Sequence, residues 1–177
     1  PGLLLGHRDD VPTPGGVAGC VARASDLAFD RVISSDLRRS SIPAAEIAQQ
    51  RGLPHDLDLR WREIDFGAWD GLMPGQIDPA EQSRFWDDPD ACPPPGGERW
   101  SQLRARVGEG LAQVREASLI LSHGGAMRAA LSVVFGFDHR QVWAFDLPYG
   151  ALVSLRIWPG DGVPAGQILT LDSGTPT

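Results

Sequence analysis

Three apolar runs that end abruptly in polar residues constrain the fold of this chain most strongly. The runs cover residues 3–5 (LLL), 31–34 (RVIS) and 118–122 (SLILS). A continuous apolar run bounded by turn residues is typical of a strand that is covered on both faces. Helical patterns separate the runs, and strands that alternate with helices predict an α/β fold, with a mainly parallel sheet wrapped by helices.

The expected helices are marked by capping residues and by apolar spacing. Thr13 and Pro14 fit the N-cap and the first position of a helix that extends to about Leu27. Gly52 fits the end of a second helix, which covers about 37–50. The remaining expected elements are an extended segment at 57–61, a helix at 99–116, a helix that opens at Gly124, and a closing hairpin formed by 151–158 and 166–171.

The length of 177 residues fits one domain, 1–177, with one cleft. Residues 67–97 are rich in Asp, Pro, Gly and Trp, and they predict an irregular insertion over the active-site end of the sheet. We see neither a membrane-spanning run nor a signal-like stretch, so we expect a soluble, cytoplasmic protein. Cys20 and Cys92 lack the spacing of a zinc knuckle or a disulfide framework, which fits reduced, structural thiols.

The charge of the chain argues against two classes of partner. Nucleic acids and anionic membranes select a basic footprint, and the net charge here is −7. We therefore expect neither of them as a partner. All sixteen basic residues are arginine, so any cationic contact to a ligand is a guanidinium, which suits a bidentate contact with phosphate or carboxylate.

Two histidines follow two of the apolar runs directly: His7 follows the first and His123 follows the third. Ligands of open parallel sheets bind at the carboxyl ends of the strands, so the two imidazoles would meet if their strands are neighbours. Residues 34–39 follow the second run, and Gly124 and Gly125 open a helix whose amides can point at an anion. A single histidine at a strand end is more often a hydrogen-bonded structural group, but the pair together with arginines favours chemistry.

Phosphoryl transfer suits this set of side chains best. No HxxxH, HxH or Asp-rich cluster accompanies either histidine, and the GxSxG motif of serine hydrolases is absent. Guanidinium groups, imidazoles and helix N-terminal amides together position and neutralise a phosphoryl group. This chemistry requires neither a metal nor an organic cofactor, so we expect none.

Four motifs are similar to those of a known family. SSDLRRS, GLPHDLDLRWREIDFGAWDGL, PPGGE and LSHGGAMRAAL occur in the order and approximate spacing found in the histidine phosphatase superfamily, the phosphoglycerate mutase-like proteins. The second and third motifs most resemble the alpha-ribazole phosphatase and broad phosphatase branch. The resemblance covers nearly the whole chain, and it implies a three-layer α/β/α sandwich with a mainly parallel central sheet.

The resemblance also implies roles for residues near the phosphate. By position, His7 matches the nucleophile that becomes a phosphohistidine, and His123 matches the histidine that hydrogen-bonds the phosphoryl oxygens. Arg39 matches the phosphate-clamping arginine. Gly124 is expected to offer its amide to the phosphate.

Glu63 in REIDFG matches the family's acid, which protonates the leaving oxygen. Read from the residues alone, it has a structural alternative as a salt-bridge partner of Arg60 or Arg62. Glu98 of PPGGE either faces the cleft or caps the following helix. Arg128 is expected to be a structural ion-pair residue.

The first motif departs from the family pattern. The family has Arg-His-Gly after its first strand, and the same positions here are Gly6, His7 and Arg8. Loss of one phosphate-gripping arginine typically costs about 1.5 to 3 kcal/mol. Arg8 compensates if the segment is extended, because residues two apart then point to the same side. We therefore count Arg8 among the expected phosphate-binding residues.

Three functions are compatible with these residues. The first is a phosphomonoesterase that acts on a small phosphorylated metabolite through a phosphohistidine intermediate. The second is a catalytically impaired relative that binds a phosphorylated ligand or a protein partner. The third is a phosphoglycerate mutase, which the short loop after His7 disfavours because a mutase must retain its product in an enclosed pocket. The apolar segment 151–158 offers an edge suited to a homodimer.

Overall fold

The computed structural model describes residues 2–158 and 165–174. Its centre is a parallel sheet in the order β2-β1-β3, formed by β1 (Arg31–Ser34), β2 (His55–Leu57) and β3 (Ser118–Leu121). Ser34 lies opposite Leu121 in the register of β1 and β3. The carboxyl ends of these two strands therefore meet at one edge of the sheet.

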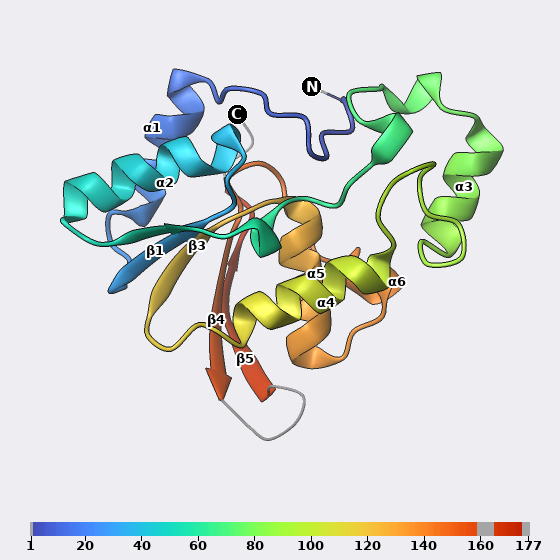
Figure 1. The fold of residues 1–177 in the computed structure, drawn as a ribbon. Helices are drawn as coiled ribbons and strands as arrows, with labels where there is room; N and C mark the ends of the chain where they lie inside the picture. The colour runs from blue at the N-terminus through green and yellow to red at the C-terminus, as the bar shows by residue number, and fades with distance from the viewer. Residues whose placement is uncertain (1, 159–164, 175–177) are drawn as a thin grey trace.

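Helices cover both faces of this sheet (Figure 1). α1 (Pro14–Ala24) and α2 (Arg38–Arg51) lie on one face, and α4 (Trp100–Leu111) and α5 (Gly124–Phe135) lie on the other. The expected α/β/α sandwich with a mainly parallel sheet is confirmed.

Each face of the sheet has its own apolar core. Val32 is fully buried in a cluster with α1 and α2, which includes Ala44 and Ile47. The next residue, Ile33, packs instead against the cluster that contains Leu103 of α4, because successive side chains of a strand point to opposite faces. One short apolar strand thus joins the two helical layers.

Local capping signals set the helix ends as expected at several positions. The Thr13 hydroxyl accepts the Gly16 N–H at 3.1 Å at the start of α1, and Gly52 ends α2 in a left-handed conformation (φ 65°). The helix expected at 99–116 is α4, which ends at Leu111, five residues before the expected end. The segment expected to be extended forms only the short strand β2 and then a 3₁₀ turn, η1 (Leu59–Trp61).

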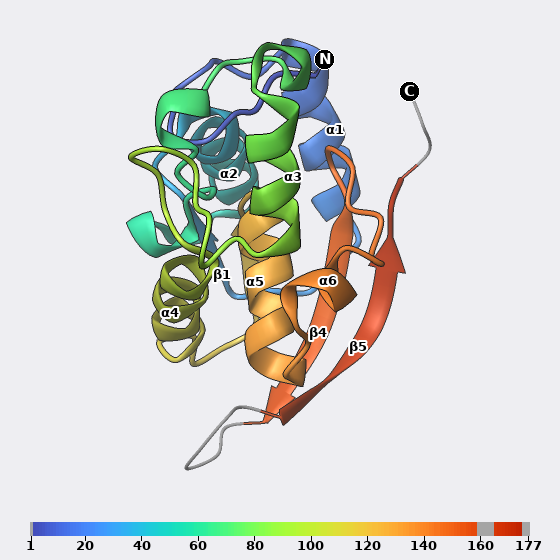
Figure 2. The ribbon, with the colours of Figure 1, turned by 90° about the vertical axis from the view of Figure 1, so that its right-hand side faces the viewer.

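The closing hairpin is confirmed as an antiparallel pair, β4 (Leu152–Trp158) and β5 (Ala165–Asp172). It follows a short helix, α6 (His139–Val142), and runs alongside α5 (Figure 2). Gly166 allows this close approach, because a Cβ there would lie 2.6 Å from a Val134 methyl group. Among the described residues, no helix has the length and apolar character needed to cross a membrane.

The expectation of an irregular insertion at 67–97 is wrong for its middle part. The segment contains two 3₁₀ turns, η2 (Gly67–Trp69) and η3 (Pro74–Gln76), and also a nine-residue helix, α3 (Pro79–Asp87). Asp and Pro indicated a break in structure, but here they occupy the two positions that start a helix. The Asp78 carboxylate accepts the Ala80 N–H at 2.7 Å, and Pro79 takes the first helical position.

The expectation of a buried strand at Leu3–Leu5 is also wrong. Residues 2–10 form no strand, and the Leu3 side chain is 40% exposed. The Leu4 N–H donates to the Leu72 carbonyl at 2.9 Å, and the Gly71 N–H donates to the Leu4 carbonyl at 2.7 Å. This pairing with 71–72 satisfies the backbone of Leu4 outside the sheet.

Candidate active site

The edge where β1 and β3 end brings together side chains from distant parts of the sequence. His123 follows β3 and caps α5, and its residue surface is only 8% exposed. Its Nε2 lies 2.7 Å from the Ser35 hydroxyl, and its Nδ1 lies 3.2 Å from Nε of Arg39. An arginine Nε can only donate, so Nδ1 is the acceptor and Nε2 carries the proton.

His123 is held in its neutral form. Burial lowers the pKa of His123 from 6.5 to about 3, and the positive charges of Arg39 and Arg106 act in the same direction. His123 and Arg39 thus lie together at this edge of the sheet, with 3.2 Å between Nδ1 and Nε. A neutral imidazole with a fixed tautomer offers a hydrogen-bond donor whose direction is set in advance.

The Glu63 carboxyl group lies against the start of α5. Its two oxygens accept the N–H of Ile64 at 2.8 Å and the N–H of Gly125 at 3.1 Å. Burial raises the pKa of Glu63, although these two hydrogen bonds and the charges of Arg39 and Arg106 oppose the shift. A carboxyl group with a raised pKa is suited to donate a proton near neutral pH.

The salt-bridge alternative for Glu63 is not what the structure shows. Arg60 pairs with Asp58 at 2.8 Å, and Arg62 pairs with Asp36 at 2.5 Å. The arginines that flank Glu63 in sequence are thus committed to other carboxylates. Gly124 begins α5 next to His123, but it is Gly125 whose amide contacts Glu63.

The guanidinium of Arg39 also holds the N-terminal segment. Its terminal nitrogens donate to the carbonyl oxygens of Gly6 and Arg8, both at 2.6 Å, and of Leu5 at 3.2 Å. With the contact to His123, these bonds engage all three nitrogens of the guanidinium. Residues 5–8 therefore occupy three of the four N–H groups on the terminal nitrogens of Arg39.

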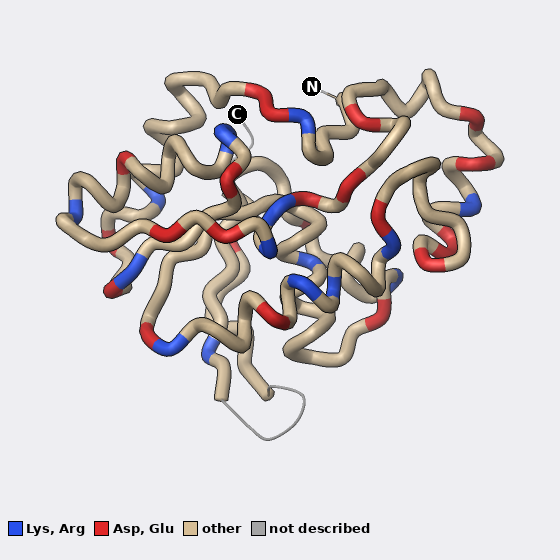
Figure 3. The backbone as a smooth tube through the Cα atoms, in the orientation of Figure 1, with Lys and Arg blue, Asp and Glu red and all other residues tan. Residues whose placement is uncertain are grey.

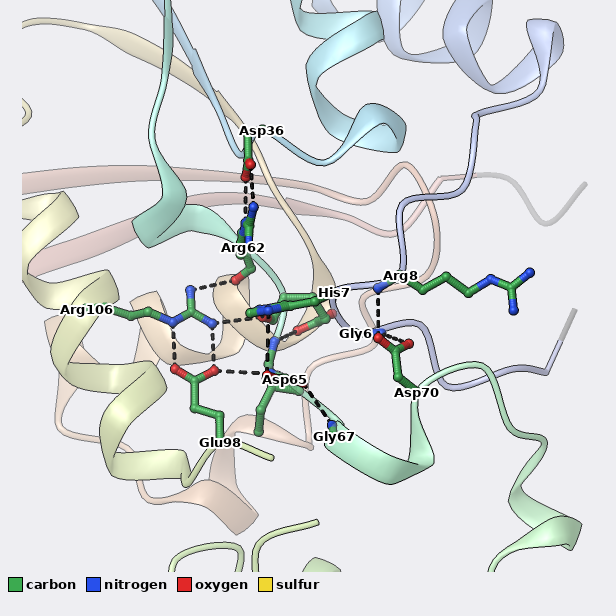
Figure 4. A network of polar contacts seen from close by, with 12 residues as sticks. Gly6, His7, Arg8, Asp36, Arg62, Asp65, Gly67, Asp70, Glu98 and Arg106 are labelled. Carbon is green, nitrogen blue, oxygen red and sulfur yellow. Dashed lines mark hydrogen bonds and ion pairs between the residues drawn. The ribbon is translucent and has the colours of Figure 1, made fainter. Parts of the chain in front are cut away.

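His7 reaches the site without a strand to carry it. The Asp70 carboxylate accepts the N–H of Gly6 at 2.9 Å and the N–H of Arg8 at 2.7 Å, which fixes the backbone on both sides of His7. The His7 ring lies beside Asp65, with Nδ1 3.7 Å from the carboxylate (Figure 4). Its Nε2 lies 3.0 Å from the Glu63 carbonyl oxygen, so Nε2 is the donor and Nδ1 holds the lone pair of the neutral ring.

The expectation that Arg8 binds phosphate is wrong in this arrangement. Its side chain is 55% exposed, pairs with Asp10 at 3.0 Å and points away from His7 (Figure 4). The argument from alternation assumed an extended strand, and residues 6 and 7 form a bend instead. A side chain at position 6 has no room either, because a Cβ on Gly6 would lie 2.9 Å from the Ile64 carbonyl and the Phe66 amide.

Sequence reasoning missed Arg106, which donates to the Glu63 carbonyl and pairs with Glu98 at 2.7 Å. Glu98 neither caps α4 nor faces an open cleft; the N-cap residue is Arg99. Asp70, which holds the backbone around His7, was also missed. Asp70 and Glu98 lie within the quoted motifs, but Arg106 lies outside all four of them. A separation of eight residues is not a helix-neighbour spacing, so the sequence does not indicate its pairing with Glu98.

Within 2–158 and 165–174, no group of three or more His, Cys, Asp or Glu residues is arranged to hold a metal ion. The groups that converge are a buried neutral imidazole, a guanidinium, a carboxyl group with a raised pKa and a second imidazole. This arrangement can bind an anion and move a proton.

Comparisons with known families and sequences identify the family of the chain. The family model described as "Histidine phosphatase superfamily (branch 1)" matches residues 17–166, which include Arg39, Glu63 and His123 but not His7. A phosphoserine phosphatase 1 of Hydrogenobacter thermophilus is 30% identical over 125 residues, which span 66% of this chain and 59% of that protein. A 2,3-bisphosphoglycerate-dependent phosphoglycerate mutase of Methylobacterium is 29% identical and covers 97% of this chain and 91% of its own length.

Solved structures share the fold. A mycobacterial glucosyl-3-phosphoglycerate phosphatase superposes with a TM-score of 0.85 at 22% identity, over 98% of this chain and 92% of its own. The alpha-ribazole phosphatase of Shigella flexneri superposes with a TM-score of 0.81 at 23% identity, over 99% of this chain and 92% of its own. At these identities the likeness concerns the fold.

Proposed function

Because the chain belongs to the histidine phosphatase superfamily, branch 1, we propose that it is a phosphomonoesterase acting on a small phosphorylated metabolite. The observation that carries this proposal is the convergence of Glu63, Arg39 and His123 at one edge of the sheet. A guanidinium and an imidazole N–H neutralise and orient a phosphoryl group. The carboxyl group beside them supplies the proton that an alkoxide needs on leaving.

We propose that the phosphoryl group is transferred to His7. Nδ1 attacks phosphorus, the bond from phosphorus to the ester oxygen breaks, and the leaving oxygen takes the proton of Glu63. Water then attacks the phosphohistidine and gives a proton to Glu63, the bond from phosphorus to nitrogen breaks, and phosphate leaves. For this sequence of steps the phosphoryl oxygens have to replace the carbonyls of residues 5–8 as acceptors of the Arg39 guanidinium. They also have to replace the Ser35 hydroxyl as the acceptor of the His123 N–H.

A catalytically impaired relative that binds a phosphorylated ligand or a protein partner is the second candidate. Two observations favour it: His7 lies outside the matched residues 17–166, and the donors of Arg39 already bond to main-chain carbonyls. A phosphoglycerate mutase is the third candidate, since relatives of similar identity carry that name. Turnover of phosphate esters indicates the phosphomonoesterase, binding without turnover indicates the impaired relative, and isomerisation of phosphoglycerate indicates the mutase.

Phosphate release from a panel of esters tests the proposal. The panel includes p-nitrophenyl phosphate, glycerol phosphate, phosphoserine and phosphoglycerate, and phosphoglycerate is also assayed for isomerisation. We expect release by the native protein, loss of release in His7→Ala and in Arg39→Gln, and no change in His139→Ala, whose ring contacts the Asp87 carbonyl on the surface. Phosphohistidine is sought by mass spectrometry after an alkaline quench.

The outcomes separate function from mechanism. If phosphate release survives in His7→Ala but is lost in Glu63→Gln, the transfer to His7 is refuted and the proposed phosphatase activity still holds. Binding of phosphate esters without release by any variant supports the impaired relative. Isomerisation of phosphoglycerate without net release of phosphate supports the mutase.

The proposal also covers the cellular location of the protein and its partners. Cys20 and Cys92 are free thiols, which supports a reducing compartment, the cytoplasm. Arginines are interspersed with acidic residues along the chain (Figure 3), which agrees with a small-molecule substrate and supports neither nucleic acid nor membrane as a partner. The homodimer through residues 151–158 is tested by sedimentation equilibrium.

A further inference from the structure

The guanidinium of Arg106 uses all of its hydrogen-bond donors inside the protein. Nε and one terminal nitrogen donate to the two carboxylate oxygens of Glu98, at 2.7 and 2.8 Å. The terminal nitrogens also donate to the carbonyl oxygens of Arg60, Arg62 and Glu63, at 2.8 to 2.9 Å. An arginine has five N–H groups, and these five bonds occupy all of them.

Glu98 holds the same segment from its other end. One of its carboxylate oxygens accepts the Asp65 N–H at 3.2 Å, and its own N–H donates to the Asp65 carbonyl at 2.8 Å. Figure 4 shows the contacts between Arg106 and Glu98. Their side chains are only 20% and 13% exposed, so the pair is largely shielded from water. The backbone is therefore fixed on both sides of Glu63.

Regular secondary structure does not hold Glu63. Residues 62–66 lie between η1 and η2, outside any helix or strand. The bonds from Arg106, on α4, replace the repeating backbone ladder that would otherwise fix this segment. A bidentate guanidinium–carboxylate pair has a preferred planar geometry, so it can hold the backbone around Glu63 in a fixed position.

We propose that Arg106 and Glu98 form a positioning pair that holds Glu63 where it can give its proton to the leaving oxygen; this inference rests on the proposed function. Neither residue touches the substrate in this scheme. Arg106 has no donor left over, and the carboxylate of Glu98 serves Arg106 and the Asp65 amide.

The charges of the pair also bear on Glu63. Arg39 from α2, Arg106 from α4 and Arg128 from α5 all interact with its carboxyl group, and the His7 ring contacts its backbone carbonyl. The positive charge of Arg106 lowers the pKa of Glu63. Removal of Arg106 raises that pKa, whereas removal of the Glu98 charge leaves Arg106 uncompensated and lowers it.

The leaving group of the ester isolates the contribution of the acid. An alkoxide needs a proton to leave, whereas p-nitrophenolate is a weak base and leaves without one. The comparison uses kcat/KM, which reports the steps up to phosphoryl transfer and leaves out the later hydrolysis, where Glu63 takes a proton whichever ester is used. In Arg106→Gln we expect kcat/KM for glycerol phosphate to fall about a hundredfold, as for a catalytic group displaced by about 1 Å. We expect a much smaller loss for p-nitrophenyl phosphate, and no recovery in Arg106→Lys, because an ammonium cannot make the five planar bonds.

The two halves of the pair are expected to move the pH profile in opposite directions. The basic limb of kcat/KM for glycerol phosphate shifts to higher pH in Arg106→Gln and to lower pH in Glu98→Gln. The control variants Arg31→Gln and Glu116→Gln break an ion pair at the opposite end of the sheet, and we expect each of them to leave the basic limb of the pH profile in place. Circular dichroism establishes that each variant is folded.

A measurement on the free protein makes the result independent of turnover. The Glu63 carboxyl carbon is titrated by ¹³C NMR and assigned with Glu63→Gln. If its pKa moves as expected while no ester is hydrolysed, the proposed function fails, and what remains is that Arg106 and Glu98 set the pKa of Glu63. Equal losses on both esters with an unmoved pH profile, or an unmoved Glu63 titration in both folded variants, overturn the pair.

Discussion

Substitution of Gly125 by alanine is the sharpest test of the site, because it acts on Glu63 without changing any charge. A Cβ at position 125 would lie 2.1 Å from one Glu63 oxygen and 3.1 Å from its carboxyl carbon. Contacts below about 3 Å are not tolerated, so the carboxyl group has to move by about 1 Å. A misplacement of this size costs about a hundredfold in rate.

The effect on stability is expected to be much smaller than the effect on rate. Displacement of the carboxyl group breaks its bonds to the Ile64 and Gly125 amides, each with a net contribution of about 1 kcal/mol. Alanine in place of a helical glycine returns about 0.5 to 1 kcal/mol. We therefore expect the free energy of unfolding to fall by about 1 kcal/mol, which leaves the protein folded.

The assay is kcat for glycerol phosphate together with urea denaturation. The matched control is Gly19→Ala in α1, where an added Cβ meets nothing within 4 Å, so alanine should stabilise the protein and leave the rate unchanged. An unchanged rate in Gly125→Ala, in a protein that hydrolyses the ester, refutes Glu63 as the proton donor. A loss of several kcal/mol in stability refutes the local displacement on which the argument depends.

Three further predictions concern the fold and the ends of the site. The pKa of His123 is depressed from 6.5 to about 3, so the unfolded chain binds a proton at a higher pH than the folded protein does. The contribution of His123 to stability is therefore full above pH 6.5 and falls by up to about 1.4 kcal/mol per pH unit as the pH drops toward 3. Urea denaturation at several pH values should show that His123→Asn loses part of this dependence. Leu103→Ala should cost about 2 to 5 kcal/mol in the same assay, because Leu103 is fully buried, whereas Leu59→Ala, 60% exposed, should change stability by less than about 0.5 kcal/mol. Gly6→Ala should detach the Gly6 and Arg8 amides from Asp70, and hydrogen exchange would then show that the amides at positions 6 and 8 lose their protection. Protection of these amides that is retained in Gly6→Ala, or lost in the control Gly15→Ala, contradicts the close packing at position 6.

The parts of the site that were predictable from sequence are those that a parallel sheet dictates. β1 and β3 are apolar runs with clear ends, and neighbouring parallel strands deliver the residues after their carboxyl ends to the same edge. Arg39 and His123 meet for this reason. Arg106 was not predictable in this way, because its role depends on the distance between α4 and a loop without regular structure, and no local pattern records that distance.

The segment around His7 shows why an apolar run alone does not define a strand. The run at 3–5 has the same local signal as those of β1 and β3, but a strand exists only where a neighbouring strand satisfies its backbone, and the Leu4 backbone bonds to 71–72 instead. His7 nevertheless comes close to Glu63, because the Asp70 carboxylate fixes the amides on both sides of it. Its place in the site is therefore set by one carboxylate, and not by the sheet. An exchange of the side chains at positions 6 and 8 consequently does not restore a phosphate grip here, since position 6 is packed against backbone and position 8 faces solvent.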